Sequence, residues 1–220
     1  MKIVFCIPST TRNREDNNKV LEIIISLSKI RKYKNKPDIY IGYDSDDPIY
    51  MQKQKRDNIY PELNIKWYPQ DVEKGNVVKI WNNLTEQAVK DGYEYIMLIG
   101  DDIIYPDNED WINKFCEGLK KNNMYGISAG YSGNLKLPMT QFMITYKHYE
   151  LFNYAFNPEL KNWYSDNYLG ELYPNKYINY FEDITLWNSG NNPRYIPENH
   201  RELYKELLIK DKLKLNNIKI

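Results

Sequence analysis

The sequence contains few cysteines and histidines and no long apolar run. Its 2 cysteines and 2 histidines are too few for a disulfide framework or a Cys/His zinc centre. Cys6 and Cys116 each lie among apolar residues, so we expect two buried thiols in a reducing compartment. No stretch approaches the roughly 18 apolar residues of a membrane span, and the run before Pro8 is too short for a signal peptide. We therefore expect a cytoplasmic protein.

The sequence also carries no excess of charge of either sign. Its 30 basic and 30 acidic residues cancel, so a broad nucleic-acid surface is not expected and nucleic acid is excluded as a predicted partner. Hydrophobic residues make up 42% of the 220 residues, which is enough for a real core. We expect one domain, with a nucleotide-binding half at about 1–115 and an acceptor-binding half at about 116–220.

Short apolar segments alternate with amphipathic segments in the first half. Strands are predicted within residues 2–8, 37–48, 63–69 and 93–100, and helices within 14–33, 76–92 and 109–122. Strands that are apolar on both faces and separated by helices indicate an α/β fold with a mostly parallel sheet.

The second half has a more mixed character. Residues 124–152 predict a strand, a turn-rich loop and a second strand, and residues 159–174 predict a short helix. Residues 176–184 are either a last strand or the start of a helix. The basic segment 200–220 predicts a helix, for which packing on the domain is favoured over contact with an anionic membrane.

Polar residues follow several of the predicted strands directly. They form the clusters 9–12, 44–47 and 101–102. Ligands of parallel α/β sheets bind beyond the carboxyl ends of the strands, so we expect these clusters to gather at one edge.

The adjacent carboxylates of Asp101 and Asp102 close a strongly apolar strand. A turn would explain them, because Asp is common after a strand and Gly100 helps the chain to bend. A carboxylate pair for glycoside hydrolysis fits poorly, because that chemistry needs the two groups on opposite sides of a bond. A divalent cation relieves the repulsion between neighbouring carboxylates, and the other acidic cluster favours this metal-binding interpretation.

These segments together resemble the GT-A-fold glycosyltransferases of the large family 2-like group. The resemblance rests on "IPSTTR", "IGYDSDD", "KGNVVKIWNN" and "MLIGDDIIY", and it covers roughly residues 2–115. It implies a mostly parallel, Rossmann-like nucleotide-binding sheet flanked by helices, with a smaller mixed region on the acceptor side. It also implies transfer of a sugar from a UDP- or dTDP-type donor to a glycan or other hydroxyl acceptor.

The resemblance further implies a Mn²⁺ or Mg²⁺ ion at the strand end. A strict Asp-x-Asp motif is absent, because Gly100 stands where its first aspartate could be. We expect Asp102 to bind the metal directly and Asp101 to contact the ribose or the metal through water. His200 is a candidate third metal ligand, with a surface residue at the start of the last helix as its alternative. His148 is expected to pack on a helix.

Candidate nucleotide-binding residues lie in the first half. They are Pro8, Ser9, Thr10, Arg12, Asp44, Asp46, Lys79 and Asp101. Asp44 is the preferred base-reading residue, because a carboxylate can accept from the imide N–H of uracil or thymine, and Asp46 or Asp47 could do the same. Arg12 and Lys79 are candidates for the diphosphate, and Lys79 falls in the first turn of a predicted helix, where anions are favoured.

Candidate catalytic and acceptor-binding residues lie in the second half. An inverting enzyme needs a base for the acceptor hydroxyl, and Asp166 is preferred over the alternatives Glu182 and Asp183. Three aromatic residues near it, Trp163, Tyr164 and Tyr168, could form a platform for the acceptor sugar. The plain alternative is that Ser165 or Asp166 caps the helix.

Two other functions remain open at the level of sequence. A nucleotidyltransferase acting on sugar phosphates needs the same metal and diphosphate chemistry, but the loop after the first strand lacks the glycine-rich, basic character usual there. A non-catalytic carbohydrate-binding protein could retain the same fold.

Overall fold

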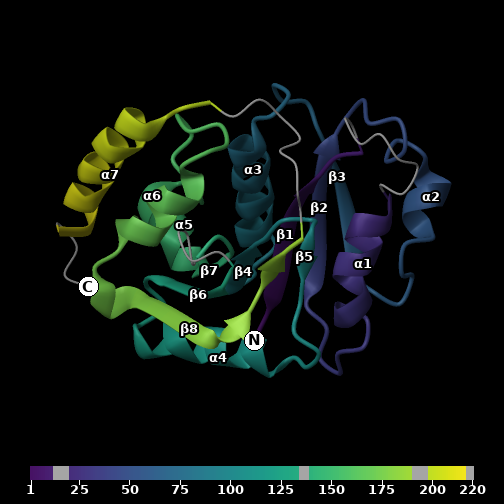
Figure 1. The fold of residues 1–220 in the computed structure, drawn as a ribbon, viewed down its shortest axis with the longest axis horizontal. Helices are drawn as coiled ribbons and strands as arrows, with labels where there is room; N and C mark the ends of the chain where they lie inside the picture. The colour runs from purple at the N-terminus through teal and green to yellow at the C-terminus, as the bar shows by residue number, and fades with distance from the viewer. Residues whose placement is uncertain (12–19, 134–138, 190–197, 217–220) are drawn as a thin grey trace.

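The computed structural model describes residues 1–11, 20–133, 139–189 and 198–216 (Figure 1). A central sheet has the strand order β3-β2-β1-β4-β7-β6-β8, and β5 and β9 form a separate two-stranded sheet. The strands are β1 (Ile3–Ser9), β2 (Asp38–Asp44), β3 (Ile65–Gln70), β4 (Tyr95–Leu98), β5 (Ile103–Ile104), β6 (Ile127–Tyr131), β7 (Phe142–Thr145), β8 (Ile178–Thr185) and β9 (Trp187–Asn188).

The first four strands of the central sheet are parallel. β1 pairs in parallel with β2 and β4, and β2 pairs in parallel with β3. Only β7 runs the other way, and it is antiparallel to both β4 and β6, while β6 and β8 are parallel. The predicted α/β architecture is confirmed, and β1 to β4 all end at one side of the sheet, which we call the carboxyl edge.

Helices cover both faces of the central sheet (Figure 1). They are α1 (Val20–Ile30), α2 (Lys53–Asp57), α3 (Val77–Lys90), α4 (Asp110–Lys121), α5 (Tyr146–Phe152), α6 (Ser165–Leu172), the 3₁₀ turn η1 (Asn175–Tyr177) and α7 (Arg201–Asn216). Alternate residues of β1 enter separate cores: Val4 and Cys6 pack with α3, α5, α6 and α7, whereas Phe5 and Ile7 pack with α1 and α4. Each face of the sheet therefore has its own hydrophobic layer.

The predicted strands and helices of the first half are confirmed in kind and approximate position, apart from residues 14–19 of the first helix, which lie outside the described residues. Other features needed the structure. Residues 178–185 form a strand, which settles the choice left open there. The second strand of 124–152 ends at Thr145, whose hydroxyl accepts from the Lys147 N–H at 3.2 Å and starts α5. The short helix α2 and the small sheet of β5 and β9 were not predicted.

The C-terminal helix packs on the domain rather than standing apart. Tyr204, Leu207, Leu208 and Leu215 are buried, while Ile209 and Leu213 face outward. Within the described residues, no helix combines the length and apolar character needed to cross a bilayer. Both cysteines are buried free thiols, as expected.

His148, a residue of α5, is fully buried. Its Nδ1 lies 2.8 Å from the Tyr173 hydroxyl and its Nε2 lies 3.0 Å from the Ala155 carbonyl oxygen. Burial lowers its pKa from 6.5 to about 4, so the imidazole is neutral in the folded protein near pH 6. The expectation that His148 packs on a helix is confirmed.

This burial predicts a loss of stability in acid. Between pH 6.5 and 4 the unfolded chain binds a proton at His148 that the folded chain does not, so the free energy of unfolding falls as pH decreases. From pH 7 to pH 5, the advantage of the wild type over His148→Gln should shrink by about 2 kcal/mol in urea unfolding. A constant difference between the two proteins would contradict this role.

Candidate active site

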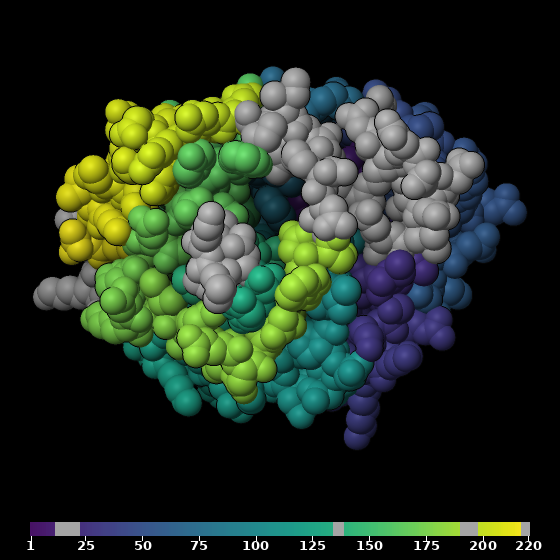
Figure 2. Space-filling model, in the orientation of Figure 1, coloured from purple at the N-terminus to yellow at the C-terminus, as the bar shows by residue number. Residues whose placement is uncertain are grey.

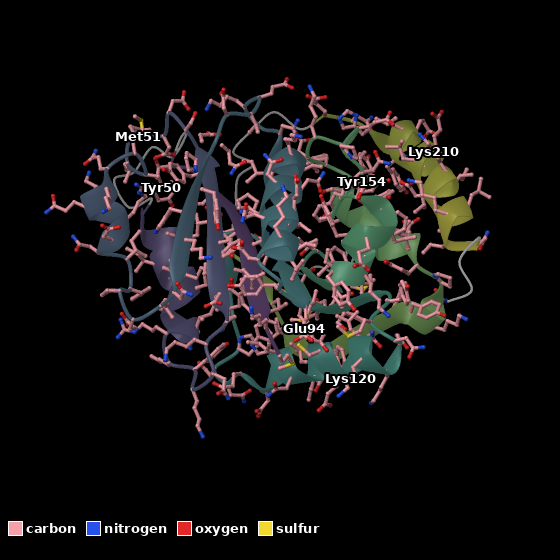
Figure 3. All side chains as sticks on the ribbon, turned by 180° about the vertical axis from the view of Figure 1, so that it is seen from behind. Tyr50, Met51, Glu94, Lys120, Tyr154 and Lys210 are labelled. Carbon is pink, nitrogen blue, oxygen red and sulfur yellow. The ribbon has the colours of Figure 1, made fainter. Side chains whose placement is uncertain are left out.

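The ends of β1 and β4 meet at the carboxyl edge through a buried hydrogen bond. Ser9 Oγ donates to Asp101 Oδ2 at 2.6 Å, and the Tyr50 hydroxyl lies 2.9 Å from the same Ser9 Oγ. Figure 3 shows Tyr50 toward this end of the sheet and Glu94, which precedes β4, toward the opposite end. The gathering of the polar strand ends is thus confirmed for β1 and β4.

The end of β2 joins the same group. Thr10 Oγ1 lies 3.3 Å from Asp44 Oδ2 and also 3.3 Å from Asp47 Oδ2. Asp47 is fully buried, and it accepts from the Thr11 N–H and hydroxyl, both at 2.7 Å, and from the N–H groups of Ile49 and Tyr50. These bonds hold the loop after β2 against the loop after β1, so Asp47 has a structural role.

Asp44 is buried next to Lys74, a residue that the sequence prediction did not include in the site. Lys74 Nζ, from the loop between β3 and α3, lies 3.4 Å from Asp44 Oδ2 and also pairs with the exposed Asp46. Lys74 is followed by Gly75 and Asn76, which lead into α3. The start of this helix was predicted to face phosphate, and this position could have identified Lys74 as a site residue. The Asp44 carboxylate, a hydrogen-bond acceptor, and the Lys74 ammonium group therefore lie side by side at the carboxyl edge.

Three separate segments hold Gly100–Asp102, which we call the acid turn. Besides the bond from Ser9, Gly100 N donates to Gln141 Oε1 at 2.8 Å, and Ser189 donates from its N–H (2.9 Å) and its hydroxyl (2.7 Å) to the Asp102 carbonyl oxygen. Asp101 is only 2% exposed and Asp102 is half-buried. The two carboxylates therefore have different surroundings.

The N-terminus of α3 lies at the same edge, because α3 follows β3. Its capping residue Asn76 accepts from the Lys79 N–H at 3.0 Å, and the Lys79 side chain is exposed. Pro8 is buried within β1. Arg12, the other diphosphate candidate, lies outside the described residues.

Asp166 lies in the first turn of α6, half-buried. The Asn167 N–H donates to its Oδ1 at 2.9 Å. Burial raises the pKa of the Asp166 carboxyl, partly offset by these local backbone bonds. The capping residue is Tyr164, in a left-handed conformation with φ of 68°, so the prediction of a cap at Ser165 or Asp166 is wrong.

The start of α6 is attached to the start of α3. The Val78 N–H donates to the Lys161 carbonyl oxygen at 3.0 Å, and Asn162 Nδ2 donates to the Gly75 carbonyl oxygen at 3.1 Å. Residues just before Asp166 therefore lie at the carboxyl edge. In Figure 2 the surface is hollowed between the green atoms before α6 and the yellow-green atoms near β9.

The alternative bases Glu182 and Asp183 lie on β8, the edge strand, and both are exposed. Lys114 Nζ of α4 lies 2.8 Å from Asp183 Oδ2, and this hydrogen bond lowers the pKa of the Asp183 carboxyl. A carboxylate held against α4 with a lowered pKa is a poorer proton acceptor than Asp166.

The three candidate platform aromatics have different surroundings. Trp163 is 49% exposed, and the Tyr164 ring stacks on Tyr204 of α7 with the ring centres 5.2 Å apart. Tyr168 is fully buried, and its hydroxyl donates to Asp211 Oδ2 at 2.7 Å. No acceptor can stack on Tyr168, so that assignment is corrected: Tyr168 attaches α6 to α7.

The proposed third metal ligand does not join the acid turn. His200 Nε2 lies 3.1 Å from Glu198 Oε2. Among the described residues, no three His, Cys, Asp or Glu side chains are grouped to hold a metal ion.

A scan against protein-family models and a search of curated proteins find no match. Solved structures do match. TarS from S. aureus in complex with UDP-GlcNAc aligns with a TM-score of 0.68 and 12% identity, over 100% of this chain and 68% of that chain. The mannosyltransferase PcManGT from Pyrobaculum calidifontis, in complex with GDP-Man and Mn²⁺, aligns with a TM-score of 0.63 and 10% identity, over 100% and 65%.

A third structure represents different chemistry. The 4-diphosphocytidyl-2C-methyl-D-erythritol synthase from Anaerococcus prevotii aligns with a TM-score of 0.53 and 12% identity, over 98% of this chain and 96% of that chain. This chain has a GT-A-type nucleotide-sugar transferase fold. At these identities the similarity concerns the fold, and the chain spans about two thirds of the TarS and PcManGT chains.

The contrast between Asp47 and its neighbour Asp46 gives a stability test. Asp47→Ala leaves the N–H groups of Thr11, Ile49 and Tyr50 without their acceptor, so the free energy of unfolding should fall by about 3 kcal/mol in urea titration. Asp46→Ala removes an exposed ion pair and should cost less than about 1 kcal/mol. Equal losses would show that Asp47 does not organise the two loops.

Proposed function

We propose that this protein is a metal-dependent, inverting glycosyltransferase that moves a sugar from a UDP- or dTDP-type donor to a hydroxyl group of a glycan or glycoconjugate. The observation that carries the proposal is the acid turn, held beside the ends of β1 and β2 in a sheet with this fold. The protein has two free, buried thiols, Cys6 and Cys116, which is consistent with the proposed cytoplasmic location.

Asp44 and Lys74 are proposed to read the base. A buried carboxylate accepts from an imide N–H, and an ammonium group 3.4 Å away can donate to a neighbouring ring carbonyl, which is the pattern that uracil and thymine present. Pro8, Ser9 and Thr10 form the adjacent wall, and Asp46 orients Lys74 from the other side.

The acid turn fits a hard divalent cation. Such ions take oxygen ligands, and one or two protein carboxylates with diphosphate oxygens complete the shell of Mg²⁺ or Mn²⁺. Asp102, the more exposed of the pair, is proposed as the direct ligand, with Asp101 fixed by Ser9 toward the ribose. When bound, the cation supplies positive charge for the leaving diphosphate.

The chain's own groups support the remaining steps. The N-terminus of α3 and the exposed Lys79 favour the donor phosphates at the carboxyl edge. Asp166 is proposed to accept the proton of the acceptor hydroxyl as its oxygen attacks the anomeric carbon and the bond to the diphosphate breaks. The raised pKa of its carboxyl makes Asp166 a stronger base than an exposed aspartate.

Nucleotidyl transfer is the second candidate, because a solved cytidylyl-type synthase shares the fold over nearly its whole length. The end of β1 argues against nucleotidyl transfer. Ser9, Thr10 and Thr11 there form hydrogen bonds with carboxylates, and these positions lack the glycine-rich phosphate-binding loop that such enzymes usually have. The two functions differ in what binds: a nucleoside triphosphate in one case and a nucleoside diphosphate sugar in the other.

Ligand-dependent thermal denaturation tests the donor site. UDP or dTDP with Mn²⁺ should raise the melting temperature of the wild type, since ligands that bind only the folded state stabilise it by mass action. Asp102→Ala should abolish the metal-dependent part of this shift, whereas Asp183→Ala on β8 should retain it. Stabilisation by CTP but by no diphosphate would instead support nucleotidyl transfer, and no response to any nucleotide would support a non-catalytic role.

Asp166→Asn tests the base. It preserves size and hydrogen-bonding capacity but removes the proton acceptor, so nucleotide binding should persist while sugar transfer falls by at least about 100-fold. The wild type should show a rise in kcat/KM with pH whose midpoint lies above the usual range of an aspartate, and this limb should vanish in the variant. Undiminished transfer by Asp166→Asn would exclude it as the base.

A further inference from the structure

Trp187 lies beside the acid turn and has no part in the function proposed above. It begins β9 and pairs with Ile104 of β5, two residues beyond Asp102. The next pair of β5 and β9 joins Ile103 to Asn188, and the Ser189 N–H donates to the Asp102 carbonyl oxygen at 2.9 Å. The hydrogen-bonded ladder thus continues from Trp187 directly to the acid turn.

The Trp187 ring rests on a glycine. A Cβ atom at Gly133 would lie 2.5 Å from Cε3 and 2.8 Å from Cζ3 of the ring, so only glycine allows this approach. Gly133 also has φ of +84°, a conformation that other residues rarely adopt. The ring is therefore positioned by backbone on one side, and the side chain is still 49% exposed.

Trp187 and Ile104 lie on the same face of the small sheet, because they are directly paired. Ile103 is fully buried, whereas Ile104 is 40% exposed, so alternate residues point to the core and to the surface. Asp102 directly precedes β5, and its carbonyl oxygen accepts from Ser189, two residues after Trp187, so Trp187 is close in the chain to a residue that holds the acid turn.

The strand order places Trp187 away from the nucleotide side of the acid turn. Ser9 and Asp44 end β1 and β2, on one side of β4, while Gly133 follows β6, on the other side of β4. In Figure 2 the yellow-green atoms near β9 form part of the rim of the hollow. A molecule that stacks on Trp187 would approach from the acceptor side.

We propose that Trp187 is the platform on which a pyranose ring of the acceptor stacks, an inference that rests on the glycosyltransferase function proposed above. One face of a pyranose carries mainly C–H groups, and it packs on an aromatic ring while the hydroxyl groups at its rim remain free for the reaction. A ring that backbone holds in place loses little freedom on binding. Ile104 extends the apolar surface beside it.

The test uses the whole protein with UDP and Mn²⁺. The probes are the methyl pyranosides of glucose, galactose, mannose and N-acetylglucosamine. Binding is measured by saturation-transfer NMR. At least one pyranoside should bind the wild type, Trp187→Ala should weaken it about tenfold, and Trp187→Phe should retain most of the affinity. Leu213→Ala, an exposed apolar residue on α7, is the matched control and should bind like the wild type.

Two results would overturn the platform: equal binding by the wild type and Trp187→Ala, or no binding of any pyranoside to the wild type. Nucleotide stabilisation is measured in parallel, and Trp187→Ala should leave it unchanged. An absent nucleotide response in the wild type would contradict the proposed donor chemistry, whereas loss of the platform alone would leave that chemistry standing.

Discussion

The hydrogen bond from Ser9 to Asp101 is the interaction on which the candidate site depends. It joins the ends of β1 and β4 and fixes one of two adjacent carboxylates in a buried position. Gln141 and Ser189 hold the same turn through backbone groups, so segments from across the sheet converge on three residues. The two adjacent carboxylates repel each other at this junction. The cation and diphosphate of the proposed function would relieve this repulsion.

A second set of contacts joins α6 to α7. Asp211 of α7 is fully buried, and it accepts from the hydroxyl groups of Tyr154 and Tyr168 at 2.6 and 2.7 Å, while Lys214 pairs with its other oxygen. Figure 3 shows Tyr154 on the side of the molecule that carries α7 and Lys210 farther out on that helix. Because Tyr168 and Asp166 belong to the same helix, α7 fixes the element that carries the proposed base.

Sequence patterns predicted the layers of the fold better than the details of the site. The short apolar runs of β1 and β4 are local signals, and the structure reproduces both strands. Asp44 and Asp47 look alike in sequence, and only their partners separate a buried loop anchor from an acceptor beside Lys74. Tyr168 looked like an exposed aromatic because its partner Asp211 lies 43 residues away. The contact of Trp187 with Gly133 is equally distant in sequence, and no periodic pattern of residues predicts it.

The most direct test of the central claim is a crystal structure of the protein with UDP and Mn²⁺, with the ion located by anomalous scattering. We expect manganese within coordination distance of an Asp102 carboxylate oxygen and next to the diphosphate, with the uracil ring beside Asp44 and Lys74. A manganese ion bound elsewhere, or a diphosphate that does not reach the acid turn, would contradict it.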